Sequence, residues 1–172
     1  MDDLIKEYLD KTYITALLCE MSYNHYSFLY QIIIFPTILS SSLLTVLNSS
    51  EIDKDVIKII NIVINGMNTI LLAINSNFKL NDRYNHFHSM RVKFNSLNHK
   101  LETDINKQKI DKNIVINIEE TITCFDNLYN DLNYQFPSQI KNKIIKKYGA
   151  FKKLPNSLQV DFDTPQISVD MV

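Results

Sequence analysis

Two consecutive uncharged segments constrain the fold of this chain more than any other feature of its sequence. No Asp, Glu, Lys or Arg occurs between Glu20 and Glu51, and none occurs between Lys58 and Lys79. A helix of about twenty residues crosses the roughly 30 Å hydrocarbon layer of a bilayer. Because the stretch SSEIDKDV that joins the two segments is only eight residues long, the sequence predicts a helical hairpin.

Either a membrane or the core of a soluble helical bundle would accommodate these segments. The first uncharged run is thirty residues long, which exceeds what a bundle helix needs. Pro36 inside it is better tolerated in a membrane, where nearby hydroxyls satisfy the freed carbonyl. Lys58 and Lys79 bracket the second run and can extend toward opposite interfaces. We therefore predict two spans, although several asparagines in the second span are costly to place in hydrocarbon.

The chain as a whole is predicted to be all-α, because only two glycines occur in 172 residues and apolar positions recur three and four apart. The first helix carries such a stripe at Leu4, Tyr8, Thr12 or Tyr13, Leu17, Met21 and Phe28. The second span is expected to continue directly into another long helix. The predicted parts are an amphipathic helix over 1–26, the two-span hairpin over 27–78, a cytosolic coiled-coil-like region over 79–133, a basic amphipathic helix over 134–153 and a disordered tail over 154–172.

Polar side chains inside the spans fall on stripes, because their spacing returns them to one side of a helix. One interpretation is a hydrophilic stripe that lines a pore in an oligomer. Another is amide-mediated contact between helices without conduction, and a third is the coding bias of an AT-rich genome. The positions are Thr37, Ser41 and Thr45 in the first span and Asn61, Asn65, Asn68 and Asn75 in the second.

Basic residues are concentrated in the second half of the chain, where fourteen of the eighteen Lys and Arg lie at or after Lys79. The basic helix over 134–153 fits contact with an anionic leaflet, or it is a solvated helix face, and nucleic acid is not an expected partner. Basic residues beside the spans predict that both termini are cytosolic. The lysines expected at a membrane surface are Lys58, Lys79, Lys141, Lys143, Lys146 and Lys147.

The sequence offers little for catalysis or for metal binding. His86 and His88 are two residues apart, so on a helix they point in different directions and cannot share a metal. No base accompanies the serines of the first span, and we predict neither an enzyme nor a cofactor. Cys19 and Cys124 form no motif and are predicted to be buried, reduced thiols. The last residues, VDMV, fit a strand-adding peptide groove, so a cytosolic partner for the tail is a hypothesis.

The order of these features resembles the SLATT domain, a two-span effector domain associated with nucleotide-sensing conflict systems and also found in eukaryotes and large viruses. The resemblance covers about residues 12–110. It rests on the aromatic and histidine patch YNHYSFLYQ, on a first span with a proline and small hydroxyls (IIIFPTILSSSLL), and on the second span running into NFKLNDRYNHFHSMRVKFNSLNHKLETDI. The positions that match the family habit are Pro36, Phe78, His86, Phe94 and Leu97.

The resemblance implies a membrane effector that oligomerises and perturbs or permeates a bilayer without catalysis. Its expected partners are the lipid bilayer and further copies of the same chain. The many asparagines in the second span depart from the small and apolar residues usual in the family. Two other functions remain alternatives at this point, namely a structural or scaffolding membrane protein, for example of a viral envelope, and a soluble helical interaction module.

Overall fold

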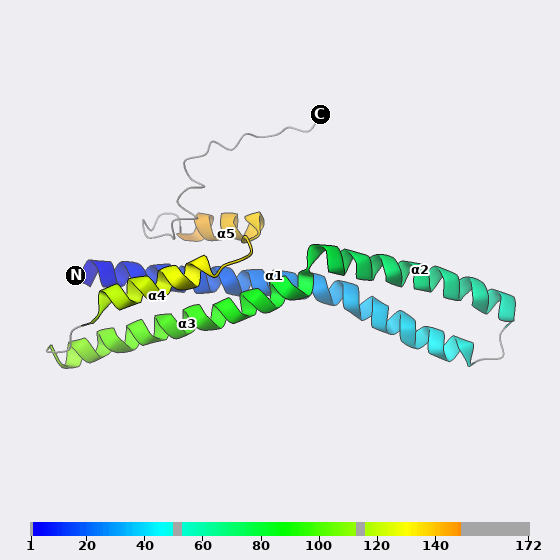
Figure 1. Cartoon of the computed structure of the whole chain (residues 1–172), viewed down its shortest axis with the longest axis horizontal. Coiled ribbons are helices and arrows are strands. Elements are labelled where there is room, and N and C mark those ends of the chain that lie inside the picture. Colours follow the sequence, from blue (N-terminus) through cyan, green and yellow to red (C-terminus); the bar gives the residue numbers. More distant parts are fainter. Residues whose placement is uncertain (1, 50–52, 113–115, 149–172) are drawn as a thin grey trace, which may run out of the picture. The chain divides into compact units, whose positions relative to one another are not determined.

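The computed structural model describes residues 2–49, 53–112 and 116–148, and all regular structure within these ranges is helical (Figure 1). The prediction of an all-α chain is therefore confirmed. The predicted tail over 154–172 and the end of the predicted basic helix lie outside the described residues. The helices are α1 (Asp2–Asn48), α2 (Lys54–Phe78), α3 (Leu80–Ile110), α4 (Ile118–Asn130) and α5 (Ser138–Tyr148).

The chain divides into two compact units. Among the described residues, the bundle unit consists of 2–22, 87–112 and 116–148, and the hairpin unit consists of 23–49 and 53–86. Helices α4 and α5 belong wholly to the bundle unit and α2 wholly to the hairpin unit, whereas α1 and α3 contribute residues to both.

The bundle unit has an apolar core typical of soluble helical domains. Phe87 and Phe94 of α3 are completely buried, and the ring of Phe125 in α4 packs edge-on against Phe94 with centroids 5.8 Å apart. Helix α5 adds Ile140 and Ile144 to this core. Burial of a large apolar side chain contributes about 1.5–3 kcal/mol, so these contacts account for much of the stability of the unit.

The first part of α1 buries a face that matches the predicted apolar stripe only in part. Leu4 and Tyr13 stay exposed, at 39% and 52%, whereas Thr12 and Thr15 are completely buried. The Thr15 hydroxyl donates to the Lys11 carbonyl over 2.7 Å. Because a hydroxyl that is satisfied by its own helix is not costly to bury, small polar residues occupy the core here. The predicted stripe was wrong at Leu4 and Phe28, which are exposed, and of the two alternatives Thr12 and Tyr13 it is Thr12 that is buried.

Caps and polar contacts position the short helices of the bundle unit. Asn117 caps α4 by accepting from the Glu120 N–H over 3.2 Å, and Lys100 Nζ lies 2.8 Å from Glu120 Oε1, which links α3 to α4. Helix α5 starts directly after Pro137, whose carbonyl accepts from the Ile140 N–H over 3.0 Å. A proline suits the start of a helix because it has no N–H to leave unsatisfied there.

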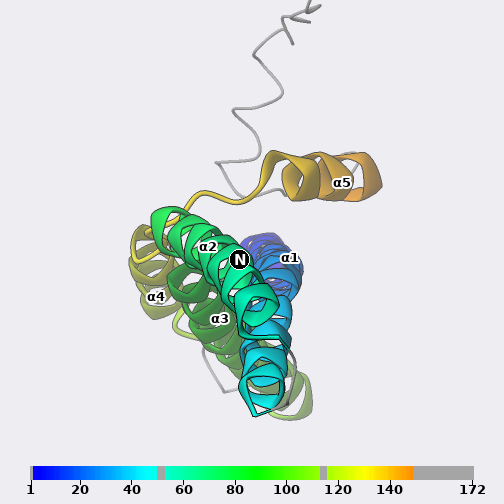
Figure 2. The ribbon, with the colours of Figure 1, turned by 90° about the vertical axis from the view of Figure 1, so that its right-hand side faces the viewer.

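The hairpin unit pairs the second part of α1 with α2, which runs back beside it (Figure 1 and Figure 2). Helix α1 continues through Pro36, and one residue later the Thr37 hydroxyl donates to the Ile33 carbonyl over 2.8 Å. Asp53 caps α2, since its side chain accepts from the Asp55 N–H over 3.0 Å. An Asp suits this position, because its side-chain oxygen accepts from a backbone N–H that has no partner within the helix.

Helices α2 and α3 are separated by a single residue, Lys79, with φ 48° and ψ 43°. Its N–H donates to the carbonyls of Asn75 and Ser76, and its own carbonyl accepts from the Arg83 N–H over 3.0 Å. A residue other than glycine costs about 1–2 kcal/mol in this left-handed conformation. The prediction that the second span continues directly into the next helix was therefore wrong. The break could not be recognised in the sequence, because the apolar spacing persists across it.

Candidate functional site

Polar side chains of α1 and α2 meet inside the hairpin unit. The Ser40 hydroxyl donates to Asn68 Oδ1 over 2.7 Å, and Asn61 Nδ2 donates to Asn48 Oδ1 over 2.9 Å. Ser40, Asn61 and Asn68 are half-buried between the helices. Side-chain hydrogen bonds of this kind contribute about 0.6–2 kcal/mol each to helix association in a membrane, so this row of contacts fixes how α2 is rotated against α1.

Asn75 continues the same face of α2. Asn61, Asn68 and Asn75 are spaced by seven residues, which is the repeat that returns a position to the contact face of two packed helices. Asn75 is half-buried, and its Oδ1 has no hydrogen-bond partner among the described residues. A buried acceptor without a donor costs on the order of 1–3 kcal/mol, so this end of the amide row is left unsatisfied within the hairpin unit.

The remaining predicted polar positions do not join this row. Asn65 is exposed, and so are Ser41 and Thr45, whose hydroxyls donate to the carbonyls four residues earlier in α1. Thr37 is half-buried but also donates within its own helix. The predicted set therefore separates into an inner amide row and a group of polar side chains on other faces of the two helices.

The outer surface of the hairpin unit is strongly apolar. It contains sixteen of the twenty large hydrophobic side chains that are exposed among the described residues. In the most apolar eighteen-residue window of α2 no residue is buried, and in that of α1 11% of the residues are buried. Both helices are long and apolar enough to cross a membrane. A core helix of a soluble domain would be mostly buried, and these two windows are not.

Small residues form a line on the exposed side of α2, which sequence reasoning overlooked. Gly66, Thr69, Ala73 and Ser76 are all exposed and recur at intervals of three, four and three residues. A Cβ placed on Gly66 would meet nothing within 4 Å, so packing inside the hairpin unit does not require a glycine at this position. Small residues let membrane helices approach closely, and their common spacing was the signal available in the sequence.

An arginine and four tyrosines gather where α1 and α3 meet in the hairpin unit. Arg83 Nη1 donates to the Tyr26 hydroxyl over 3.0 Å. The ring of Tyr84 lies against those of Tyr23 and Tyr30, with centroids 5.2 and 6.1 Å away. The patch YNHYSFLYQ already contains the three tyrosines of α1, but their contact with Arg83 and Tyr84 was not predicted.

The family-like positions lie in different surroundings. Pro36 and Phe78 are exposed on the hairpin unit, and His86 is half-buried. Phe94 and Leu97 belong to the core of the bundle unit. Packing in this core is therefore a sufficient reason for the apolar side chains of Phe94 and Leu97.

The lysines expected at a membrane surface are mostly exposed. Lys58, Lys79, Lys143, Lys146 and Lys147 are exposed, and Lys141 is half-buried. The apolar face of α5 is used inside the bundle unit, where Ile140 and Ile144 are buried. In addition, a hydrogen bond with Tyr148 at the end of α5 raises the pKa of Tyr13 in α1. Contact of α5 with a bilayer would therefore be electrostatic, since its apolar stripe already has a partner.

The two cysteines have different environments. Cys19 is completely buried in the bundle unit, and burial raises the pKa of its thiol to about 12. Cys124 of α4 is exposed, so its predicted burial was wrong. Among the described residues, no group of three or more His, Cys, Asp or Glu lies close enough to hold a metal ion.

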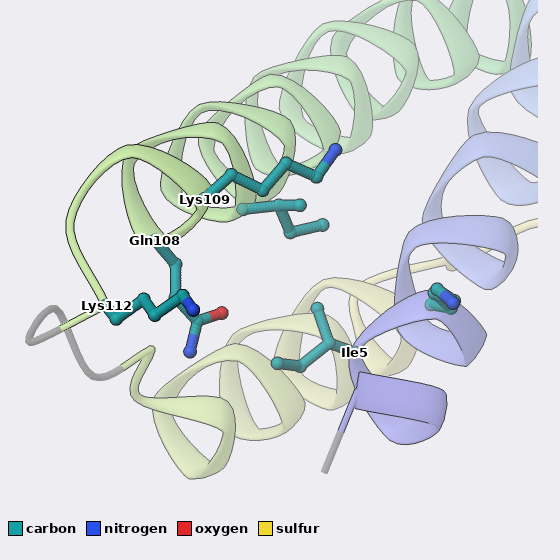
Figure 3. Close-up of a pocket in the computed structure, with 6 residues that line it drawn as sticks. Ile5, Gln108, Lys109 and Lys112 are labelled. Carbon is teal, nitrogen blue, oxygen red and sulfur yellow. The ribbon is translucent and has the colours of Figure 1, made fainter.

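A pocket of about 380 Å³ opens in the bundle unit between the first turns of α1 and the end of α3 (Figure 3). Ile5 and Ile105 contribute its apolar surface, and Lys6, Lys109 and Lys112 stand around its rim. In Figure 3 the side chains of Lys109 and Lys112 extend in different directions, so their amino groups do not converge on one point. The pocket lacks the convergent polar groups that define a specific ligand site.

No protein-family model, no curated protein and no solved structure matches this chain. Its functional interpretation therefore rests on the geometry of the two units. The hairpin unit offers an apolar outer surface, an inner amide row and an aromatic and cationic end, and these features bear on membrane contact and helix association.

Proposed function

We propose that this protein is an integral membrane protein whose α1 and α2 form a two-span hairpin. The observation that supports this most strongly is the apolar outer surface of the hairpin unit. No residue of the most apolar eighteen-residue window of α2 is buried. At about 25 cal/mol per Å² of apolar surface, such a surface is much more stable in hydrocarbon than in water. The charged residues at each end of α2, Lys58 and Lys79, fit the two interfaces.

The proposal extends to an oligomeric, non-catalytic effector of SLATT type that perturbs the bilayer or conducts. Support comes from the exposed line of small residues on α2, which suits close contact with a second copy. The exposed Asn65 lies about 40–60° around α2 from the inner amide row, and it would face water only if copies assemble around it. Both termini are proposed to be cytosolic, because basic residues are more numerous on the terminal side of the spans.

A scaffolding membrane protein without conduction is the second candidate, and a specific observation favours it. Asn61 and Asn68 are already bonded to side chains of α1. Amides used in this way hold helices together and leave fewer polar groups to line a pore. The effector and the scaffold both use Asn68 to hold the two helices together. They differ at Asn65, which lines a pore only in the effector.

Membrane insertion is tested by alkaline carbonate extraction of membranes that contain the full chain. The expected result is retention in the pellet, with release only by detergent. A chain that stays soluble and monodisperse without detergent would instead be a helical interaction module, and both membrane candidates would be rejected. Protease protection of tags placed at the two ends tests the topology, since cytosolic termini are both digested from the cytosolic side.

Conductance across planar bilayers separates the effector from the scaffold. If Asn65 lines a pore, Asn65→Leu reduces single-channel conductance or its ion selectivity while the oligomer is retained. Asn68→Leu is the matched control, because this side chain is bonded to Ser40 and its loss should weaken the hairpin before it alters the current. A wild-type chain that inserts, oligomerises and carries no current under any condition would leave the scaffold as the function.

A further inference from the structure

Arg83 is held in a fixed position by an aromatic partner. Its Nη1 donates to the Tyr26 hydroxyl over 3.0 Å, and its guanidinium carbon lies 5.5 Å from the centre of the Tyr26 ring. Tyr26 is 7% exposed, whereas Arg83 is half-buried. A guanidinium presents several N–H donors in a rigid fork, so the bond to Tyr26 fixes the orientation of the whole group, whose Nε is itself buried.

The neighbouring tyrosines form a continuous stack beside this arginine. The rings of Tyr23 and Tyr84 are inclined by 26°, and those of Tyr30 and Tyr84 by 1°. All three are half-buried. Tyrosines with one apolar side and one polar end collect at membrane interfaces, at the level of the lipid headgroups.

Helix lengths place this cluster at one boundary of the hydrocarbon layer. From Tyr30 to Asn48 the helical rise is about 27 Å, and from Lys58 to Lys79 it is about 32 Å. Both values match a hydrocarbon thickness of roughly 30 Å. Lys79 therefore ends the second span, and Arg83 follows it by four residues, which is one turn of a helix.

We propose that Lys79 and Arg83 bind the phosphate of an anionic phospholipid headgroup, with the Tyr23–Tyr84–Tyr30 stack against the adjoining glycerol region. This inference rests on the proposed membrane insertion of the hairpin unit. Arginine binds phosphate through paired N–H donors and lysine as a point charge, so the two residues supply complementary contacts. The exposed Asp82 and the half-buried His86 also belong to this end of α3, and the group keeps a net positive charge beside the single carboxylate.

The test measures lipid selectivity of the full chain in phosphatidylcholine vesicles that contain a minor fraction of phosphatidylglycerol. Electron paramagnetic resonance of spin-labelled lipids gives the association constant of each lipid with the protein. We expect the wild type to prefer phosphatidylglycerol. Arg83→Gln and Lys79→Gln should each lower that preference about fivefold, the effect of one basic residue near a surface. Arg83→Lys should retain only part of it, because the charge remains and the fork is lost.

Two control comparisons distinguish loss of the lipid site from a general loss of charge or of packing. Lys107→Gln removes the same charge from the last turn of α3 in the bundle unit, and it should leave the preference unchanged. Lys79 lies outside the tyrosine stack, so its variant reports on the site even if Arg83→Gln disturbs packing. Equal preference for both lipids in the wild type, or unchanged preference in both glutamine variants, would overturn the inference.

Free phosphate and membrane insertion are tested separately. Displacement of the labelled phosphatidylglycerol by inorganic phosphate, but not by chloride at equal ionic strength, would assign the site to a soluble phosphate and reject the lipid. Carbonate extraction of the same samples separates the two proposals. A chain that is extracted fails the proposed function, whereas an inserted chain without lipid preference fails only this inference.

Discussion

Ser40 of α1 and Asn68 of α2 are joined by a hydrogen bond of 2.7 Å between two helices that are otherwise largely apolar in this unit. The bond connects positions 28 residues apart in the chain. In the proposed membrane hairpin few other polar partners exist, so a contact of this kind has a large influence on which faces of the two helices meet. It therefore supplies a direct way to test the hairpin.

Removing either side of this bond should weaken the hairpin. We expect Ser40→Ala and Asn68→Leu each to lower the free energy of unfolding by about 1 kcal/mol. The double variant should lose less than the sum of the two, because the bond is removed only once. Thermal unfolding in detergent, followed by circular dichroism, measures the cycle. Ser42→Ala is the matched control, since Ser42 is exposed and bonds only to its own helix, and additive losses at Ser40 and Asn68 would argue against the contact.

Bulk added to the small-residue line of α2 should disrupt association of copies. We expect Gly66→Leu to weaken the proposed oligomer at least about tenfold, because a larger side chain prevents close approach of helices. Light scattering of the detergent-solubilised chain, over a range of protein-to-detergent ratios, gives the oligomer size. Val63→Phe adds bulk to a different exposed side of α2 and should have little effect. Equal behaviour of the two variants would show that this line is not the interface.

Lys79→Gly should stabilise the protein by about 1 kcal/mol. Lysine pays a steric penalty at φ 48°, and glycine does not. The same substitution at Lys58, which is exposed inside α2, should instead destabilise by about 1 kcal/mol, because glycine is a poor helix former. Urea titration in mild detergent compares the two. A loss of stability at both positions would contradict the left-handed conformation of Lys79.

The two thiols should differ strongly in reactivity. Burial raises the pKa of Cys19 to about 12 from an ordinary value of 9.0, so at pH 8 hardly any thiolate exists at this residue. A disulfide reagent should modify exposed Cys124 rapidly and Cys19 only on unfolding. The pKa of Cys19 is higher in the folded than in the unfolded chain, so its ionisation does not lower the free energy of unfolding below pH 9. That free energy falls as the pH rises from 9 toward 12. Fast labelling of Cys19 in the Cys124→Ser variant, under native conditions, would contradict its burial.

The docking of α5 is tested by shortening a core side chain. Ile144 is 1% exposed, so Ile144→Ala should lower the free energy of unfolding by about 2–4 kcal/mol. Lys143→Ala, one residue away and exposed, should change it by less than about 0.5 kcal/mol. Chemical unfolding followed by circular dichroism gives both values. Similar small effects would mean that the apolar face of α5 is not part of the core and is available to lipid.

Several features could be predicted from the sequence because they depend on local chemistry. The cap at Asp53 and the apolar stripe of α3 through Phe87, Phe94 and Leu101 follow from residue type and spacing. Burial of Thr15 could not be predicted in the same way, because a hydroxyl becomes acceptable in a core only when its helix supplies an acceptor and its neighbours cover it. The break at Lys79 left no mark in the apolar spacing either.

The sequence by itself determined that the chain is helical and that two uncharged segments, each long enough to cross a bilayer, follow one another. Lengths and charges of consecutive residues suffice for that conclusion. Only the tertiary structure decided which asparagines face α1. Successive helical residues are rotated by about 100°, so Asn65 lies on the edge of the stripe that Asn61 and Asn68 share. Contact with Asn48 and Ser40 brings those two inward and leaves Asn65 exposed.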